Sequence, residues 1–475
     1  MTMKPDKTTL LTLAGSVALG AAALPEYVQA KTRLPDKPNV ILLLVDDMGY
    51  RDTGYTGSDY YETPIIDSLA ARSMRFNQAY TCAGNSAPSR GCLMSGQFTP
   101  RHGIFAVYHT KRGPKDQMRL EPYPNTANLP LECYTMAEAM HDAGYRTGMV
   151  GKWHLGDKNH KPEHQGFDFG QEEKTQSKEA FRESGDPKNM FYEIETVSGF
   201  IEDAVKDKVP FFAYVSFHAV HTQWQARQEY IDYFKNKPAG KFHNKEVYAA
   251  MIKHLDDAIG DLLAKVRELG ISDNTIIIFT SDNGGVPQTS QYPYRAFKGS
   301  LYEGGIRVPF FIHNPEFIRP GDCDMPIANV DIYPTLLDFA GYKAPEDKIL
   351  DGISLKDISI GKKTDMNRPP IFWHFPGYLD KPCPGTRDDI FRQRPSTVMR
   401  KGDWKITLYY EEWMLDGGWD KRDTNHSVEL YNLKEDVSEI HDLAAEMPAM
   451  RDRLLKEMLK WIEDNDVQLP TKKQN

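Results

Sequence analysis

The sequence contains few cysteines, and their spacing does not indicate a metal or redox site. The five, Cys82, Cys92, Cys133, Cys323 and Cys383, include no C-x-x-C pair and no zinc-type arrangement. An odd and sparse set leaves at least one thiol unpaired, which argues against a disulfide framework. The chain also lacks an excess of basic residues, since its formal net charge is -9. This charge argues against nucleic acid or an anionic membrane as a partner, although it leaves room for a locally cationic pocket.

Long apolar runs are absent beyond the N-terminus, so no membrane span is expected. At the N-terminus, Lys4 and Lys7 precede an apolar stretch over residues 10–24, and Val28-Gln29-Ala30 fits a small-residue cleavage site. The stretch is short and rich in Gly, Ser and Thr compared with a spanning helix. We predict that residues 1–30 are a signal peptide and that the protein is periplasmic or secreted. A leader without structure and a membrane anchor are the alternatives.

Apolar runs and amphipathic segments alternate along most of the 475 residues, without an internal repeat. Helices are predicted from Thr63-Pro64, over residues 135–144, and over residues 247–269, where Gly270 ends the pattern. Such alternation is typical of an open, mostly parallel α/β sheet flanked by helices. We assign residues 36–365 to this α/β domain. The predicted strands are "NVILLLV", "RTGMVG", "PFFAYVSF", "NTIIIFT" and "VPFFIHN".

The alternation weakens after about residue 365. "STVMRKGDWKITLYY" predicts a hairpin that turns at Lys401-Gly402-Asp403, and "SVELYNL" predicts a further strand. A 3.6-residue apolar pattern predicts a helix over residues 448–463. Residues 366–475 are therefore expected to form a C-terminal α+β subdomain, in which one helix covers a small antiparallel sheet.

Polar side chains follow four of the predicted strands directly. Because ligands of parallel sheets bind beyond the carboxyl ends of the strands, these side chains should meet at one edge. Each has a simpler explanation alone: the acidic pairs suit turns, a lysine suits the surface, and a histidine suits the core. His218 is as consistent with a structural neighbour as with a ligand. The groups are Asp46-Asp47, Lys152 with His154, His218 with His221, and Asp282-Asn283.

The acidic groups predict a metal site. Asp46, Asp47, Asp282 and Asn283 supply carboxylate and amide oxygens, which are hard ligands for Ca²⁺, with Mg²⁺ as the alternative. No cysteine–histidine set suggests zinc.

Cationic side chains and a helix start complete the set. In "FKGSLYEGGIRVP", Glu303 and Arg307 are expected to pair, whereas Lys298 either points toward the cluster or lies in a solvated loop. "NSAPSR" places Ser86 and Arg90 at a predicted helix start, where a serine is also a common cap. Backbone N–H groups at such a start attract anions. The whole set suits an ester of a tetrahedral anion.

At this point the sequence resembles a known family. "SAPSRGCLMSGQ" is similar to the signature of the type I sulfatases, and "VDDMGY", "GKWHLG", "SDNGG" and "KGSLYEGGIRVP" match further family segments in the family's order. The similarity runs from about residue 38 to the C-terminus. It implies the alkaline-phosphatase-like α/β fold with a small C-terminal subdomain.

The resemblance also implies roles for the site residues. In the family, the residue at the Ser86 position is oxidised to formylglycine, whose hydrate attacks sulfur with one oxygen and expels sulfate with the other. Asp46, Asp47, Asp282 and Asn283, together with the group at Ser86, would bind Ca²⁺. Arg90 would steady the nucleophile and the cation. Lys152 and His154 would orient and deprotonate the diol. His221 and Lys298 would bind sulfate, with His221 protonating the leaving oxygen. "FHAVHTQ" departs here from the usual Pro-His-Thr-Pro form.

Together these features predict an exported sulfatase that hydrolyses sulfate esters of a carbohydrate, first an algal galactan and then a glycosaminoglycan. The aromatic segments "FWHFPGY" and "EEWMLDGGWD" suit sugar contacts or simple packing. A formylglycine-maturing enzyme is an expected partner, of the anaerobic type if Ser86 is native rather than an engineered replacement of cysteine. The alternatives are a phosphomonoester or phosphodiester hydrolase of the same superfamily, and a catalytically silent protein that binds sulfated glycans.

Overall fold

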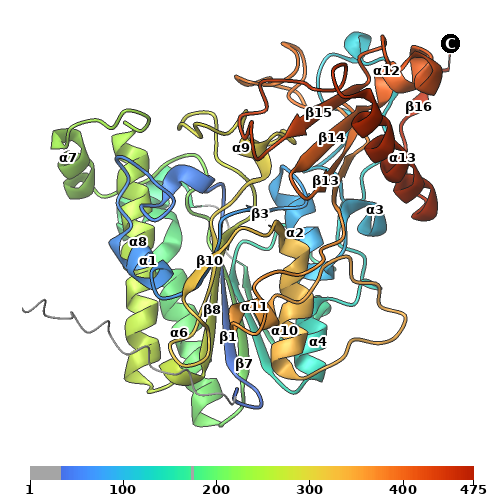
Figure 1. Ribbon diagram of the computed structural model, residues 1–475. Coiled ribbons are helices and arrows are strands. Elements are labelled where there is room, and N and C mark those ends of the chain that lie inside the picture. Colours follow the sequence, from blue (N-terminus) through green and yellow to red (C-terminus); the bar gives the residue numbers. More distant parts are fainter. Residues whose placement is uncertain (1–33, 173–175, 475) are drawn as a thin grey trace, which may run out of the picture.

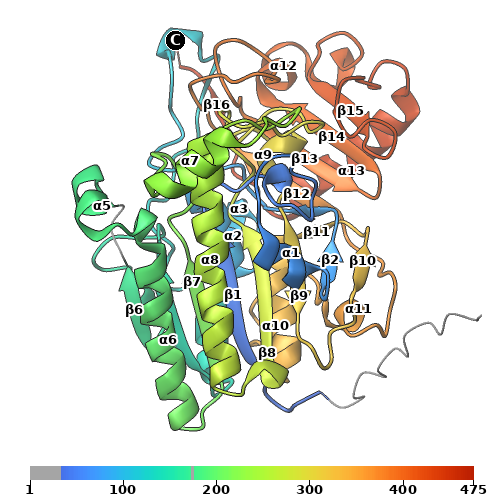
Figure 2. The same ribbon diagram turned by 90° about the vertical axis from the view of Figure 1, so that its left-hand side faces the viewer.

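The computed structural model describes residues 34–172 and 176–474, so the predicted signal peptide lies outside the described residues. An eight-stranded sheet forms the centre, in the order β10-β2-β9-β8-β1-β7-β5-β6 (Figures 1 and 2). Its strands are β1 (Asn39–Val45), β2 (Met74–Phe76), β5 (Arg146–Gly151), β6 (Phe169–Glu172), β7 (Phe211–Ser216), β8 (Thr275–Ser281), β9 (Phe310–His313) and β10 (Gly321–Cys323). The strands β8, β1, β7, β5 and β6 are parallel, which confirms the mostly parallel α/β sheet.

Helices cover both faces of this sheet, which explains why β1 is apolar at nearly every position. Successive side chains of a strand point to opposite faces. Val40, Leu42 and Leu44 accordingly pack in one core cluster, whereas Ile41 and Leu43 pack in another. In Figure 1 the two helix layers stand on either side of the sheet. One layer holds α1 (Pro64–Ala70), α6 (Met190–Lys206) and α8 (Glu246–Glu268), and the other holds α2 (Ser86–Ser95), α4 (Met136–Asp142) and α10 (Ile332–Ala340).

Strand β9 runs antiparallel to both of its neighbours, β8 and β2. A parallel successor to β8 would need a crossover to the far end of the sheet. The chain instead stays at the edge where β8 ends, through residues 282–309, and β9 starts back from there. This path includes only the short helix α9 (Glu303–Ile306) and keeps the segment around Lys298 beside the end of β8.

A second sheet follows, as the sequence predicts for the C-terminal region. It is four-stranded and antiparallel, in the order β12 (Ile371–Phe375), β13 (Ser396–Lys401), β14 (Trp404–Tyr409) and β15 (Val428–Asn432). The hairpin turns at Gly402, whose φ of 58° suits glycine. Helix α13 (Pro448–Asp464) packs on this sheet through Leu454, Leu455 and Met458 (Figure 1).

Short elements connect these layers. The remaining helices are α3 (Thr99–His102), α5 (Lys178–Ser184), α7 (Gln228–Asn236), α11 (Lys356–Ser359) and α12 (Tyr410–Leu415), and the remaining strands are β3 (Ala79–Tyr80), β4 (Leu120–Glu121), β11 (Ile327–Ala328) and β16 (Thr471–Lys472).

Among the described residues, no helix has both the length and the apolar character that crossing a bilayer requires.

A buried ion cluster joins the second sheet to α9. Lys405 of β14 lies 3.1 Å from the carboxylate of Glu303 in α9 and 2.8 Å from that of Glu439, and all three side chains are buried. Burial raises the pKa of Glu439 to about 7. For Glu303, burial also favours the neutral form, but Lys405 and Arg307 outweigh it and hold its pKa low. Arg307 lies 3.3 Å from Glu303, so these two residues pair as the sequence predicts.

We expect Lys405→Met to lower the free energy of unfolding by about 3–5 kcal/mol, because it leaves two buried carboxylates without their shared cation. The matched control is Lys401→Met, which removes an exposed ion pair with Glu457 and should cost less than about 1 kcal/mol. Urea denaturation followed by tryptophan fluorescence measures both. Equal losses for the two variants would contradict a structural role for the buried cluster.

Candidate active site

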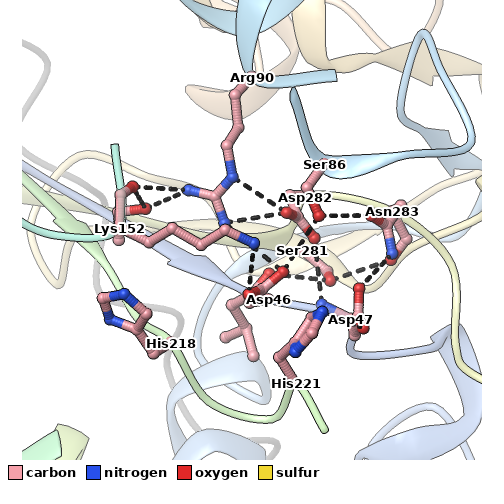
Figure 3. Close-up of polar contacts among 12 residues, drawn as sticks. Asp46, Asp47, Ser86, Arg90, Lys152, His218, His221, Ser281, Asp282 and Asn283 are labelled. Atoms are coloured by element: carbon pink, nitrogen blue, oxygen red, sulfur yellow. Dashed lines mark hydrogen bonds and ion pairs between the residues drawn. The ribbon is translucent and has the colours of Figure 1, made fainter. Parts of the chain in front are cut away.

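Four parallel strands end at one edge of the large sheet, and the polar residues after them meet there (Figure 3). β1 is followed by Asp46 and Asp47, β5 by Lys152 and His154, β7 by His218 and His221, and β8 by Asp282 and Asn283. The adjacent order β8-β1-β7-β5 makes these ends neighbours. Helix α2 and the segment around Lys298 bring the remaining groups to the same place.

Three carboxylates form the centre of this cluster. Asp46, Asp47 and Asp282 are each about 1% exposed, and one oxygen from each lies within 4.8 Å of the others. Asp47 has a left-handed backbone, with φ of 70°, and its N–H donates to Asp282 Oδ1 over 3.1 Å. Asn283 donates from Nδ2 to Asp47 Oδ1 over 2.9 Å. A left-handed non-glycine residue held by neighbouring contacts is typical of a functional site.

Ser86 is the first residue of α2, and its hydroxyl does not cap the helix. The N-cap is Asn85, and Ser86 Oγ instead lies 3.2 Å from Asp46 Oδ1 and 3.2 Å from Asn283 Oδ1. All ten residues of α2 are buried. Figure 3 shows the hydroxyl pointing into the acidic cluster, so the capping explanation for this serine is not needed.

Arg90 lies one turn further along α2 and is fully buried. Its guanidinium contacts Asp282 at 2.9 Å and the backbone oxygen of Lys152 at 3.0 Å, and it also donates to Ser216. Since Ser216 lies on β7 and Lys152 follows β5, Arg90 ties α2 to three strand ends. Its charge offsets one carboxylate of the cluster.

Two lysines offset the other two carboxylates. Lys152 Nζ lies 2.7 Å from Asp46 Oδ2, and Lys298 Nζ lies 2.5 Å from Asp47 Oδ1. Burial alone would raise the pKa of Asp46, but Lys152 and the other nearby cations hold it well below the usual range. Burial lowers the pKa of Lys152, whereas Asp47 and its neighbours raise that of Lys298 despite burial. Lys298 therefore points toward the cluster, not into a solvated loop.

The three histidines have different surroundings. Burial lowers the pKa of His154 to about 3 and that of His218 to about 3, so both are neutral near pH 7. His218 Nδ1 lies 3.0 Å from Glu193 Oε1, which leaves Nε2 for the pocket. His221 is partly exposed, and its Nε2 lies 3.6 Å from Asp47 Oδ2.

A cavity of about 750 Å³ opens above these groups. Ser86, Lys152 and Lys298 line its floor together with the three histidines, and the segments around Tyr108 and Lys381 line its outer part. A cationic floor next to a serine hydroxyl at a helix N-terminus suits a tetrahedral anion.

Two models of known protein families match this chain. Residues 38–342 match the sulfatase family model. The chain belongs to the sulfatase family. Residues 294–466 also match the model described as the C-terminal region of N-sulphoglucosamine sulphohydrolase. As a sulfatase, the protein is a sulfuric ester hydrolase.

Several sulfatases resemble it over most of their length. A protein named sulfatase from Formosa agariphila is 30% identical over 89% of this chain and 87% of its own. Arylsulfatase J of Mus musculus is 29% identical over 93% of this chain and 78% of its own. The crystal structure of Ps i-CgsB has a TM-score of 0.71 and 28% identity, over 90% of this chain and 93% of that one, and it is also solved in complex with k-i-k-neocarrahexaose.

The donor set of this sulfatase fits a hard divalent cation. Three carboxylates and the hydroxyl of Ser86 converge with Asn283 Oδ1 in one buried place, and all of these ligand atoms are oxygens. Ca²⁺ and Mg²⁺ prefer such ligands. In this structure Lys152 and Lys298 offset the charges of Asp46 and Asp47.

Other side chains that support the site carry no recognisable sequence signal. Ser216 is the last residue of the buried strand β7 and has no distinguishing neighbour in the sequence. Glu193 belongs to the amphipathic helix α6 and precedes its partner His218 by 25 residues. Lys188 is 1% exposed and lies near enough to the cluster for Asp46 to raise its pKa, although burial lowers that pKa overall. Only the tertiary contacts identify these three residues.

The aromatic side chains of "FWHFPGY" pack in the protein interior and do not face the pocket. Phe372, Trp373, Phe375 and Tyr378 of "FWHFPGY" are all buried in the core. The strand β12 contains most of this segment, and its side chains belong to the core cluster that the second sheet forms with α13. The aromatic residue that does line the pocket is Tyr108.

Proposed function

We propose that this sulfatase is exported and removes sulfate from a sulfated carbohydrate, using a formylglycine made from Ser86 and a bound Ca²⁺. The observation that carries the proposal is the position of Ser86 Oγ, 3.2 Å from both Asp46 and Asn283 and on the floor of the cationic pocket. The modification would supply a hydrated aldehyde, with one hydroxyl to attack sulfur and a second to release sulfate. A maturing enzyme would make it.

Asp46, Asp47, Asp282 and Asn283 would hold the cation together with the group at Ser86. The cation would lower the pKa of the attacking hydroxyl and neutralise sulfate oxygens. Arg90 fixes the helix that carries Ser86 relative to Asp282. Because buried Arg90 also contacts the Lys152 backbone, it positions the nucleophile and the pocket floor together.

Lys152, His154, His221 and Lys298 would act on the substrate. Lys152 and Lys298 both line the pocket beside the acidic cluster and would bind sulfate oxygens. The neutral His154 suits accepting a proton from the nucleophile. His221 is the more exposed pocket histidine and would protonate the leaving oxygen as it departs toward solvent.

The substrate class rests on the pocket and on the relatives. A cavity of about 750 Å³ exceeds the volume of one sulfate and admits a sugar ring. The similar protein Ps i-CgsB is solved with k-i-k-neocarrahexaose, which favours a sulfated algal galactan as the first class to test. Glycosaminoglycans are the second. We place the enzyme in the periplasm or outside the cell, with cleavage after Ala30, which N-terminal sequencing of the exported protein tests.

A desulfation screen tests this function. Matured protein is incubated with defined sulfated oligosaccharides and with matched phosphate monoesters and diesters, and released sulfate and phosphate are measured. We expect sulfate release from at least one sulfated saccharide, with phosphate release far slower. Faster phosphate release would favour a phosphoester hydrolase, and tight binding with no release by fully matured protein would favour a silent glycan-binding protein.

We expect Lys298→Ala to lower kcat/KM about ten- to a hundredfold, since it removes a charge-assisted bond of about 1.5–3 kcal/mol from the sulfate. Lys298→Arg should retain part of the activity, because it keeps the charge. Lys343→Ala, which changes an exposed lysine outside the pocket lining, is the matched control. Steady-state kinetics of sulfate release measure kcat/KM for each variant. A kcat/KM for Lys298→Ala equal to that of the control would show that Lys298 does not bind the sulfate.

A further inference from the structure

The cavity contains cations that the proposed chemistry does not use. Its outer part is formed by the segment before β4 and the segment after β12, and it contributes Tyr108, Arg112, Lys381 and Arg392. We call these four residues the outer wall. They lie more than fifteen residues in sequence from any proposed metal ligand, and the sequence patterns do not mark them.

The charge of the outer wall is positive. Arg112 pairs with Asp380 at 2.8 Å, so these two charges offset each other. Lys381 is exposed, and within the described residues its ammonium has no ion pair or hydrogen bond. The Arg392 guanidinium donates to the backbone oxygens of Lys381 over 2.8 Å and of Lys298 over 3.0 Å, and no carboxylate in the described part of the chain pairs with it. Two net positive charges therefore face this side of the cavity.

Arg392 links the outer wall to the floor of the pocket. Its contact with the Lys298 backbone needs glycine at position 299, where an added Cβ would lie 2.6 Å from Arg392 Cδ and 2.8 Å from Leu379. Gly299 also has φ of 90°, which an L side chain rarely adopts. The Arg392 side chain therefore bridges the backbones of Lys298 and Lys381, which holds the two lysines at a set spacing, as a site for two groups on one ligand requires.

Tyr108 presents an aromatic ring at the mouth of the cavity. It is 84% exposed and has a left-handed backbone, with φ of 71°. Asn125 holds this turn in place, since its Nδ2 donates to the backbone oxygens of Ala106 and Tyr108 over 3.0 and 3.1 Å. A strained turn that exposes a large aromatic side chain beside a cavity is better explained by a ligand than by stability.

We infer that the outer wall binds a second sulfate group and its sugar ring, next to the sulfate ester that is cleaved. This inference rests on the proposed function, since it assumes that the floor holds the first sulfate. Lys381 and Arg392 would bind the second sulfate, and Tyr108 would pack against the ring between the two. The enzyme would then prefer saccharides that carry sulfate groups on neighbouring positions or residues.

Binding measurements test this preference without requiring turnover. Galactose oligosaccharides of equal length, with one sulfate or with two, are titrated calorimetrically into the Ser86→Ala protein. We expect the doubly sulfated form to bind at least tenfold more tightly. In the same background, Lys381→Gln should reduce this ratio three- to tenfold, and Lys343→Gln should leave it unchanged. Tyr108→Ala should lower the affinity for both oligosaccharides by a similar factor.

The outcomes distinguish a failure of this inference from a failure of the proposed function. Equal affinity for the two oligosaccharides, or a ratio that Lys381→Gln does not change, overturns the second sulfate site. A further outcome is that matured protein releases no sulfate from any ester while the affinity ratio still depends on Lys381. In that case the proposed reaction would be wrong, and the outer wall would remain a binding site for a second sulfate. Thermal melting of each variant confirms that the protein titrated is folded.

Discussion

Ser86→Ala is expected to abolish sulfate release, to below about 10⁻³ of the parent rate, while the protein stays folded. The reason is positional, because Ser86 Oγ is the group on α2 that points between Asp46 and Asn283. Removing a hydroxyl from an ordinary helix cap would cost about 1 kcal/mol and would not affect chemistry specifically. Here Asn85 is the N-cap, so the loss of stability should be small and the loss of rate large.

The same position distinguishes a formylglycine precursor from a plain serine. Ser86→Cys should retain activity in a host whose maturing enzyme accepts cysteine. Peptides spanning Ser86 from active preparations should lack two hydrogens relative to serine and should react with hydrazides. Mass spectrometry measures both. Active enzyme in which every such peptide carries unmodified serine would show that the proposed mechanism is wrong. Ser89→Ala, three residues along the same helix, is the matched control.

Asp282→Ala is expected to remove the bound metal and the activity together. Asp282 is about 1% exposed and shares the acidic cluster with Asp46 and Asp47, so its loss removes one of three carboxylate ligands. It also leaves buried Arg90 without its 2.9 Å partner, which should destabilise the fold by about 3–5 kcal/mol. Asp282→Asn separates the two effects, because it keeps the shape and one oxygen while it removes the charge.

Metal content by atomic emission, calcium titration and sulfate release are measured on each variant. We expect weaker calcium binding and slower turnover in the order parent, Asp282→Asn, Asp282→Ala. Asp52→Asn is the control, since Asp52 is buried nearby but lies outside the cluster, and burial raises its pKa to about 6. Full activity of metal-free parent protein would contradict a catalytic cation at this site.

The sequence by itself determined the main elements of the fold. β1 is apolar after Asn39 and β8 is apolar over residues 276–279 because both faces of the sheet are covered, and that pattern is visible without coordinates. The hairpin at Gly402 and the amphipathic α13 were equally clear, since turn chemistry and a 3.6-residue repeat are local properties. The direction of β9 was not clear, because it depends on the path of residues 282–309 in space.

The sequence also placed oxygen ligands, cations and a serine at strand ends and at a helix start, where the topology of a parallel sheet makes them neighbours. It could not decide which groups touch. The Arg90–Asp282 pair joins residues 192 apart in sequence, and Glu193 reaches His218 only because α6 packs beside β7. The outer wall brings Arg112 and Lys381 to one cavity from segments far apart in the chain. Periodicity reports which face of an element is buried, whereas such pairs depend on strand order and loop path, which only the tertiary structure decided.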